Sequence, residues 1–390
     1  MDQFSAPSYP QVAVGPTLPA RRRRVLRWAF ASLAVLAALL AGLFTLWMIG
    51  YETGLVPLLT GLVAAAVPVP IYVALVLWLD RYEPEPPWML ATAFFWGALV
   101  AVFFAIVINS LGVLIVQSVS DANTANSYGM IVSAPVVEET AKALVLFILF
   151  FWQRDEFDDM TDGIVYAAMV GLGFAMTENV KYYGMAVVEH NAVGVFIVRG
   201  LFSPFAHPLF TGMTGVGLGL AAQSERRAVK FIAPAVGFLA AVLLHAGWNT
   251  SARLSGLNDN GAYVLLTYFF VMMPTFFGML LVVALALRRE GRILREHLRR
   301  DLASGLFTEA DYACLCSIGG RMGASYRALA VGGFSHWRAR ARFNRAASEL
   351  AFHRSRVARG IHSRTATDAE READYVQQIY RLRLQLEKQG

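Results

Sequence analysis

The sequence predicts an all-α fold: a polytopic bundle of about eight transmembrane helices, followed by a soluble helical tail. Of the 390 residues, 56% are hydrophobic and only 16% are charged, whereas a soluble domain carries about 25% charged residues. Eight apolar segments each reach the roughly 20 residues that one membrane crossing needs. After Leu287 the apolar segments end and arginine becomes frequent. These three observations together indicate an integral membrane protein with a basic extension.

The N-terminal region, residues 1–24, is expected to be a disordered basic leader. It is rich in proline and small residues and ends in the run Arg21–Arg24. The apolar run Val25–Ile49 that follows is longer than the roughly 7–15 residues of a signal-peptide core. We therefore predict a retained first span, with the arginines in front of it on the cytoplasmic side.

Seven further spans are predicted to complete a membrane domain over residues 25–287. Basic residues gather in every second connection, at Arg81, at Arg154 and in the stretch 226–230, while the other connections carry only Arg253. By the positive-inside rule, both chain ends are expected in the cytoplasm. The predicted spans are Leu55–Leu79, Trp88–Val116, Met130–Trp152, Thr161–Tyr183, Val195–Ala222, Val229–Ala252 and Ala262–Leu287.

Residues 288–390 are predicted to be a basic cytoplasmic tail built of helices. From Arg288 onward the chain has about twenty Lys and Arg but only eleven Asp and Glu. Thr308 and Asp311 have the spacing of a helix capping box, and residues 368–388 have the pattern of an amphipathic helix. The arginines are expected to bind anionic lipid headgroups. Nucleic acid is not expected as a partner, because no recognisable binding module accompanies them.

The only two cysteines of the chain, Cys314 and Cys316, lie in this tail. Two cysteines one residue apart rarely form a disulfide, so we expect free thiols in a reducing compartment. A metal site made from this pair is a weaker alternative.

Proline and glycine motifs bear on how the spans are connected and packed. The turn Asp80–Pro87 is stiff and proline-rich, and is either a simple connection or a docking point. Gly215 and Gly219 form a G-x-x-x-G motif, which predicts close packing of the sixth span against a neighbour. Pro204 and Pro208 lie on either side of a histidine in the same span, where they break backbone hydrogen bonds.

The fourth predicted span contains two adjacent carboxylates, Glu138 and Glu139, in an otherwise apolar stretch. An ionised residue at this depth costs at least roughly 2.5 kcal/mol, so it needs a partner or a water-filled cavity. Lys142 lies one turn after Glu138, and a pair between them could neutralise one carboxylate. The second carboxylate is then left without a partner on its own helix, which indicates a functional site.

Three other spans carry polar groups at a similar depth. They are Glu178 and Asn179 in the fifth span, His207 in the sixth, and His245 and Asn249 one turn apart in the seventh. With a rise of 1.5 Å per residue, the carboxylate pair and Glu178, His207 and His245 lie roughly 9–18 Å from the outer ends of their spans. A lone intramembrane His or Asn is often only a hydrogen-bond partner between helices. Because four spans contribute at one level, the sequence predicts a shared site.

These residue types suit hydrolysis. Two His and a carboxylate make a zinc-ligand set that leaves one position open for water. A further Glu could take a proton from that water and pass it to a leaving amine, and Asn249 or a His could donate to an oxyanion. A metal-free reaction, in which Glu activates water and His or Asn stabilises the oxyanion, uses the same residues.

Other functions are also compatible with buried Glu and His. A proton- or cation-coupled transporter is the main alternative, because such residues also build proton relays. An inverted repeat would favour a transporter, and the sequence has no convincing one. A non-catalytic membrane scaffold would tolerate replacement of Glu138 and Glu139 by Gln.

The motifs and their order resemble the PrsW family of intramembrane proteases, distant relatives of the CAAX prenyl endopeptidases and of bacterial immunity-type membrane proteases. The resemblance covers about residues 55–290, and the high use of Ala, Arg and Gly suits a bacterial protein. It rests on Glu138-Glu139-x-x-Lys142, Gly173-Phe-Ala-x-x-Glu178-Asn179, His207 and His245-x-x-x-Asn249.

This resemblance implies a protease domain over residues 25–287 in a bacterial plasma membrane. It implies that Glu138 or Glu139 activates water, and that a membrane-anchored protein, such as an anti-sigma factor, is the substrate. The expected cofactor is Zn²⁺, and the tail after Leu287 lies outside the family core. The further roles implied are metal or oxyanion binding by His207, His245 and Glu178, catalysis by Asn249, and support by Lys142 and Asn179.

Overall fold

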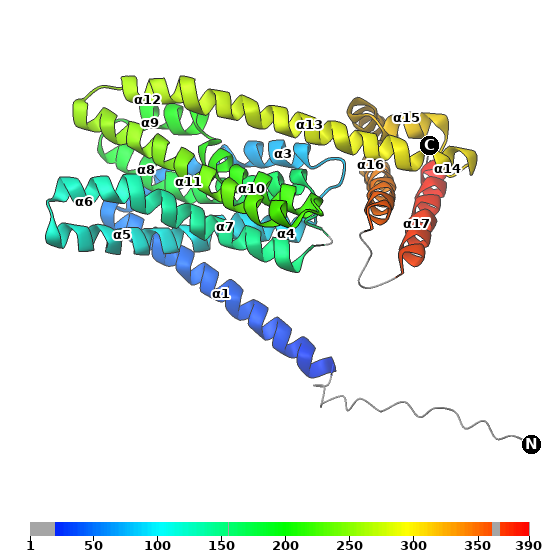
Figure 1. Ribbon diagram of the computed structural model, residues 1–390, viewed down its shortest axis with the longest axis horizontal. Coiled ribbons are helices and arrows are strands. Elements are labelled where there is room, and N and C mark those ends of the chain that lie inside the picture. Colours follow the sequence, from blue (N-terminus) through cyan, green and yellow to red (C-terminus); the bar gives the residue numbers. More distant parts are fainter. Residues whose placement is uncertain (1–19, 155, 361–366, 390) are drawn as a thin grey trace, which may run out of the picture.

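The computed structural model describes residues 20–154, 156–360 and 367–389, and every regular element in these ranges is a helix (Figure 1). This confirms the predicted all-α bundle. The expected leader lies mostly outside the described residues. The α-helices are α1 (Ala20–Thr53), α2 (Leu55–Ala66), α3 (Val69–Leu79), α4 (Pro87–Phe95), α5 (Val102–Val119), α6 (Ala122–Tyr128), α7 (Ala134–Trp152), α8 (Met160–Val188), α9 (Ala192–Phe196), α10 (Ala206–Gln223), α11 (Arg227–Asn258), α12 (Ala262–Thr267), α13 (Met273–Leu298), α14 (Arg300–Ala303), α15 (Glu309–Leu315), α16 (Ile318–Ala358) and α17 (Asp368–Gln389).

Four π-helical turns lie between α-helices in the described ranges; three of them continue directly into the next α-helix, and the one at Ile197–Phe202 is followed by a short break. In a π-helical turn each backbone hydrogen bond spans five residues, where that of an α-helix spans four. Such turns often occur at functional positions. One of these turns leads directly into α7, and another is separated from α10 by residues 203–205. The turns are η1 (Trp96–Ala101), η2 (Gly129–Ser133), η3 (Ile197–Phe202) and η4 (Tyr268–Met272).

Seven helices or helical rods in the described part of the chain are long and apolar enough to cross a membrane. Of the eight predicted spans, the fourth, Met130–Trp152, is not among these seven, because Glu138, Glu139 and Lys142 make it less apolar. It forms η2 and α7, which nevertheless pack inside the bundle against α5, α8, α10 and α11. The seven are Trp28–Thr53, Leu55–Leu79, Pro87–Val119, Met160–Val188, Ala192–Gln223, Arg227–Asn258 and Ala262–Ala303.

Helix α8 is the centre of the bundle. In its most apolar window 89% of the residues are buried, against 33% or less in the other six candidate spans. Its neighbours are α2, α3, α4, η1 and α10. A helix buried on all sides must present small residues to its neighbours, and α8 has glycine where two of them approach most closely.

These glycines permit backbone-to-backbone contact. A Cβ atom on Gly163 of α8 would lie 2.2 Å from the carbonyl oxygen of Gly215 on α10, and one on Gly173 would lie 2.0 Å from that of Phe94 on α4. A Cβ on Gly219 would lie 2.4 Å from the Cα of Met160. The G-x-x-x-G motif of the sixth predicted span therefore packs closely on α8, as predicted.

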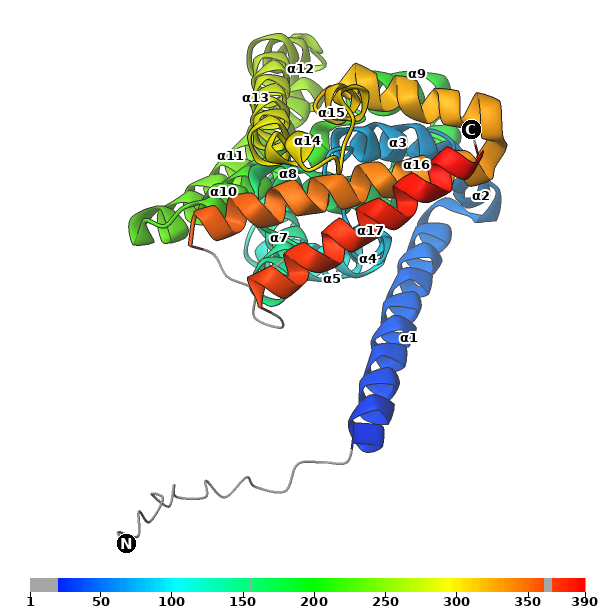
Figure 2. The ribbon, with the colours of Figure 1, turned by 90° about the vertical axis from the view of Figure 1, so that its right-hand side faces the viewer.

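The tail forms a helical cap across one end of the bundle, where α16 and α17 lie side by side (Figures 1 and 2). Arg321 of α16 donates to the backbone carbonyls of Arg81 and Tyr82 and lies over the Tyr82 ring, 4.8 Å from its centroid. The proline-rich turn is therefore a docking point for the tail. The predicted capping box at Thr308 is present, and Cys314 and Cys316 are free thiols.

A group of carboxylates lies beneath this cap. Burial raises the pKa of Asp80 to about 8, and it raises those of Glu83 and Glu85 well above the ordinary Glu value. Asp159 lies nearby and raises the pKa of Asp80 further, whereas Arg345 and the backbone N–H of Glu85 lower it. Protonation therefore stabilises the docked turn.

Replacing Gly163 by Ala should destabilise the bundle by about 1–3 kcal/mol, because the new methyl group forces α8 and α10 apart. The check is thermal unfolding of the purified protein in detergent. Gly278→Ala is the control, because a Cβ at that helical position meets nothing within 4 Å. Equal unfolding temperatures for the two variants would contradict the close contact.

The cap should loosen as the pH rises. Since the pKa of Asp80 is raised by burial, its stabilising contribution is complete below the ordinary Asp value of about 4 and is lost as the pH approaches 8. Hydrogen exchange of residues 80–87 should therefore become roughly tenfold less protected between pH 6 and pH 9, after correction for the intrinsic rate. Asp80→Asn keeps an acceptor for the Glu85 N–H and should flatten this dependence. An unchanged pH profile in that variant would contradict the assignment.

Candidate active site

The site begins where η2 passes into α7. Pro135 lies in the first turn of α7 and has no N–H to donate to a carbonyl of η2, which runs into α7 without a break. The next turns carry Glu138, Glu139 and Lys142, and all three side chains are buried, with Lys142 fully inaccessible to solvent. Three ionisable groups in one buried stretch require partners from other helices.

Glu139 is the most fully bonded of these groups. Its Oε1 accepts from Lys142 Nζ at 2.8 Å and lies 3.1 Å from His245 Nδ1 on α11. Its Oε2 accepts from the Thr211 hydroxyl of α10 at 2.9 Å. One carboxylate thus ties α7 to α10 and α11.

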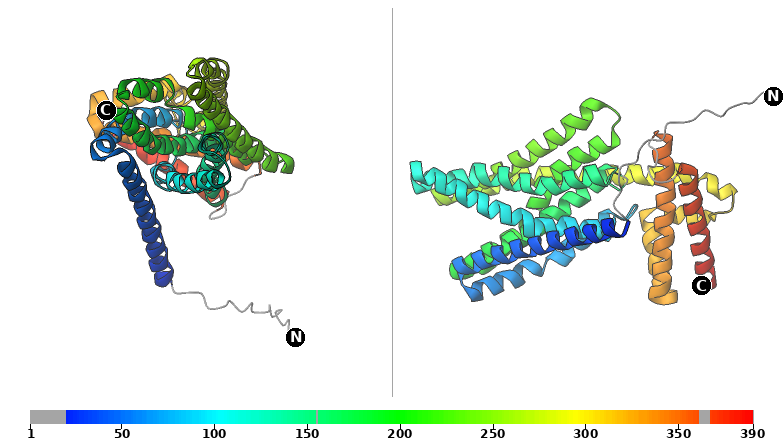
Figure 3. Two further views of the ribbon diagram at one scale, coloured as in Figure 1. Left: turned by 90° about the vertical axis from the view of Figure 1, so that its left-hand side faces the viewer. Right: turned by 90° about the horizontal axis from the view of Figure 1, so that it is seen from below.

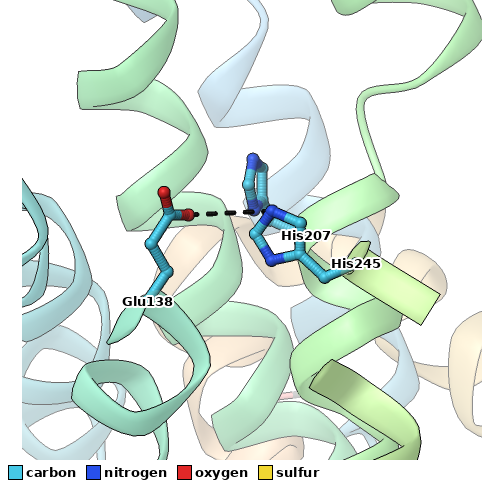
Figure 4. Close-up of side chains that lie close together, drawn as sticks. All are labelled: Glu138, His207 and His245. Atoms are coloured by element: carbon cyan, nitrogen blue, oxygen red, sulfur yellow. Dashed lines mark ion pairs between the residues drawn. The ribbon is translucent and has the colours of Figure 1, made fainter. Parts of the chain in front are cut away.

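Glu138 is bonded quite differently. Its Oε2 atom is buried and has no hydrogen-bond partner within the described ranges. The nearest charged or ring nitrogens are Lys142 Nζ at 3.6 Å and His245 Nε2 at 3.8 Å, which are close but not bonded (Figure 4). An unsatisfied buried carboxylate oxygen is costly, so its retention points to a ligand or a proton at this position.

His207 lies in the first turn of α10, just after the break between η3 and α10. Its Nδ1 is 3.0 Å from Lys142 Nζ, and its Nε2 is 2.9 Å from Glu178 Oε2 on α8. Because an ammonium can only donate, His207 must accept at Nδ1 and donate from Nε2 to Glu178. Glu178 is also held by the guanidinium of Arg199, which donates to Asn179 at 2.6 Å.

Both imidazoles are therefore backed by a carboxylate, His245 by Glu139 and His207 by Glu178. This arrangement orients the other ring nitrogen of each histidine and is typical of histidines that bind metals. Glu178 therefore lies where it orients His207, whereas Glu138 lies where it could bind a metal ion together with the two histidines.

A metal ion fits the set Glu138, His207 and His245. One ligand atom from each residue can be chosen so that all lie within 4.8 Å of one another, and neighbouring ligands of a tetrahedral zinc are about 3.4 Å apart. The unbonded Glu138 oxygen and the donor types, two imidazoles and one carboxylate, agree with such an ion. The ligand set predicted from sequence has Glu178 in place of Glu138, and it stays a prediction.

The structure brings together most of the residues expected from sequence. Asn179 is at the edge of the site, bonded to Arg199. Asn249 donates to the carbonyl of Met130 in η2 at 2.9 Å, so in this structure it ties α11 to the start of α7. Its expected role at an oxyanion stays a prediction.

Two residues of the site were missed by sequence reasoning. Arg199 neutralises Glu178, and it is the only basic residue in the predicted sixth span, which was an available signal. Thr211 bonds Glu139 and lies one turn after His207 on the same face of α10. Threonine is common in membrane helices, so its role could not have been singled out.

Comparison with known proteins identifies the family of this chain. The model of the PrsW family intramembrane metalloprotease matches residues 85–279, which is half of the chain and includes every site residue named above. The chain belongs to the PrsW family. No solved structure matches it.

Three PrsW proteases illustrate the relationship. Protease PrsW of Geobacillus kaustophilus is 35% identical over 150 residues, which cover 38% of this chain and 61% of that relative. Protease PrsW of Bacillus subtilis is 32% identical over 174 residues, or 44% and 72% of the two chains. That of Oceanobacillus iheyensis is 29% identical over 177 residues, or 44% and 74%. The PrsW match leaves out α1 to α3 and the tail, so this chain carries additional segments around the family core.

If Glu138 is a ligand and Glu178 only orients His207, their variants should differ in zinc affinity. Glu178→Gln should weaken binding by about 10–100-fold, as is usual for an orienting partner. Glu138→Gln and His245→Ala should lose measurable binding. The check is zinc titration of the metal-stripped protein by calorimetry, together with elemental analysis. Equal losses in Glu138→Gln and Glu178→Gln would contradict the assignment.

Proposed function

We propose that this chain is an intramembrane endopeptidase that hydrolyses a peptide bond of a membrane-anchored protein. Membership of a family of intramembrane proteases supports this, as does a cluster of two buried carboxylates, two buried imidazoles and a buried lysine from α7, α10 and α11, joined by the half-buried Glu178 of α8. The observation that carries the proposal is the unbonded Glu138 Oε2, which faces the space beside the two imidazoles.

In the metal-free form of this proposal, Glu138 activates the attacking water. Oε2 takes a proton from water as the water oxygen forms a bond to the carbonyl carbon of the peptide, whose oxygen becomes an oxyanion. The C–N bond then breaks, and Glu138 returns its proton to the leaving amine nitrogen. Glu139 is less suited to this task, because three donors already hold its two oxygens.

The other residues stabilise the oxyanion or hold the two histidines in place. Lys142 Nζ is the nearest positive charge to Glu138 Oε2, at 3.6 Å, and is assigned to stabilise the oxyanion. The second N–H of the Asn249 amide is available for the same purpose. Glu139 and Glu178 hold His245 and His207 in the orientation described above.

In the metal-dependent form, a divalent ion, most simply Zn²⁺, would be held by His207, His245 and Glu138, and Glu138 would then serve as a ligand in place of its role as the base. When bound, it would lower the pKa of a coordinated water and polarise the peptide carbonyl. Lys142 would then release the Nδ1 atom of His207, and its ammonium would stay bonded to Glu139.

The substrate class follows from the family resemblance and from the depth of the site. PrsW-type proteins are associated with membrane-anchored anti-sigma factors, and a site in the outer half of the membrane suits a bond close to the outer face. We place both chain ends in the cytoplasm of a bacterial cell, and the basic tail against anionic lipid there.

Replacement of Glu138 by Gln should lower cleavage by about 10²–10⁴-fold, the usual contribution of a general base. Glu139→Gln and His245→Ala should lower it by at least roughly tenfold, because they release the partners of the site. The measurement is cleavage of co-expressed single-span proteins, followed by immunoblotting. Glu52→Gln is the matched control, because Glu52 lies in an exposed ion pair with Lys181.

Cleavage that persists in all three site variants would overturn the proposal. Uptake of protons or cations by vesicles containing the wild type, without cleavage of any co-expressed substrate, would favour the transporter instead. Metal analysis of wild type and His245→Ala would separate a metal-dependent reaction from a metal-free one.

A further inference from the structure

A groove lies between α7 and the α10–α11 hairpin, at the end of the bundle that carries the tail. Its volume is about 770 Å³. The hairpin end projects from the side of the bundle in Figure 2, and the views in Figure 3 show the same bundle from two other sides. Aromatic side chains dominate the walls of the groove, among them Phe147 and Phe151 of α7 and Phe231 and Phe238 of α11.

Two basic side chains stand at the mouth of this groove. Arg154 follows the end of α7, and Lys230 lies in the first turn of α11; both are exposed and line the groove. Neither makes an ion pair with any described residue, and Arg154 only lies 5.8 Å from the Phe151 ring. The one acidic residue in the lining, Asp158, is neutralised by Arg356 of α16 at 2.5 Å. The mouth therefore has an excess of positive charge.

The groove has the length of one membrane leaflet. Its lining runs along α7 from Thr140 to Phe151, about 17 Å at 1.5 Å per residue, and ends at Arg154 just beyond the helix. Half of the roughly 30 Å hydrocarbon core plus a headgroup layer is of this size. An apolar channel of that length with cations at one end matches one acyl chain and one anionic headgroup.

We propose that this groove is a binding site for an anionic glycerophospholipid of the membrane. The phosphate lies between Arg154 and Lys230, and an acyl chain runs along the phenylalanines toward Thr140. Basic pockets between transmembrane helices on the cytoplasmic side commonly bind such headgroups. A hydrophobic helix of another protein would leave both cations unpaired, which favours the lipid. The proposal does not depend on proteolysis.

Native mass spectrometry of the full-length protein in detergent, with added phosphatidylglycerol or phosphatidylcholine, tests the site. Phosphatidylglycerol should be retained preferentially by the wild type. The double variant Arg154→Gln/Lys230→Gln should lose this preference by about tenfold, because two basic contacts to the phosphate are removed. Arg226→Gln/Arg227→Gln removes the same charge from exposed neighbours outside the lining, and should keep it.

A second pair of variants tests the acyl channel. Ala235→Trp fills the groove and should reduce retention of both lipids, whereas Leu239→Trp on α11 lies outside the lining and should not. Equal retention of the two lipids by the wild type would overturn the proposal in favour of non-specific annular lipid. So would an equal loss of the preference for phosphatidylglycerol in Arg154→Gln/Lys230→Gln and in Arg226→Gln/Arg227→Gln. Inorganic phosphate that displaces phosphatidylglycerol completely would overturn the role of the acyl channel.

Discussion

The buried charges of the site, and the need to balance them, constrain the rest of the structure. Three carboxylates, Glu138, Glu139 and Glu178, face two permanent cations, Lys142 and Arg199; the three groups on α7 are buried, and the Glu178–Arg199 pair is half-buried. Glu139 and Glu178 each have a direct cationic partner. One negative charge is left, on the carboxylate whose oxygen has no hydrogen bond. Since an uncompensated buried charge is costly, this balance favours a proton or a bound cation beside Glu138.

This balance depends on helices that start in the right places. Glu138, Glu139 and Lys142 follow the π-helical turn η2, and His207 and Thr211 follow η3 and the short break at residues 203–205. Asn249 donates to the backbone of η2, and Arg199 of η3 forms an ion pair with Glu178. The irregular backbone beside the site is therefore bonded to the site's own helices, which fits the rule that such backbone lies where it is covered by protein.

Much of this arrangement could be predicted from sequence, because charge in an apolar stretch is a strong signal. The carboxylate pair, both histidines and Lys142 meet as predicted, and depth along each span was enough to place them at one level. Depth does not give the rotation of a helix about its axis, however. Which of Glu138 and Glu178 faces the open position depends on this rotation, so the predicted grouping of Glu178 with the two imidazoles stays a prediction. Helix α7 itself shows the converse: the charges that make the site also keep it out of the set of plainly apolar spans.

The tail has a structural link to the bundle that its composition did not suggest. Many arginines favour binding to lipid headgroups, yet Arg321 bonds the turn at residues 81–82 and Arg356 pairs with Asp158. The second contact has two consequences at once. It fixes the end of α16 to the loop between α7 and α8. It also neutralises Asp158, the only acidic residue among the described residues that line the aromatic groove. Arg154 and Lys230 are then the charges that an occupant of the groove meets, so the docked tail makes that surface more attractive to an anion.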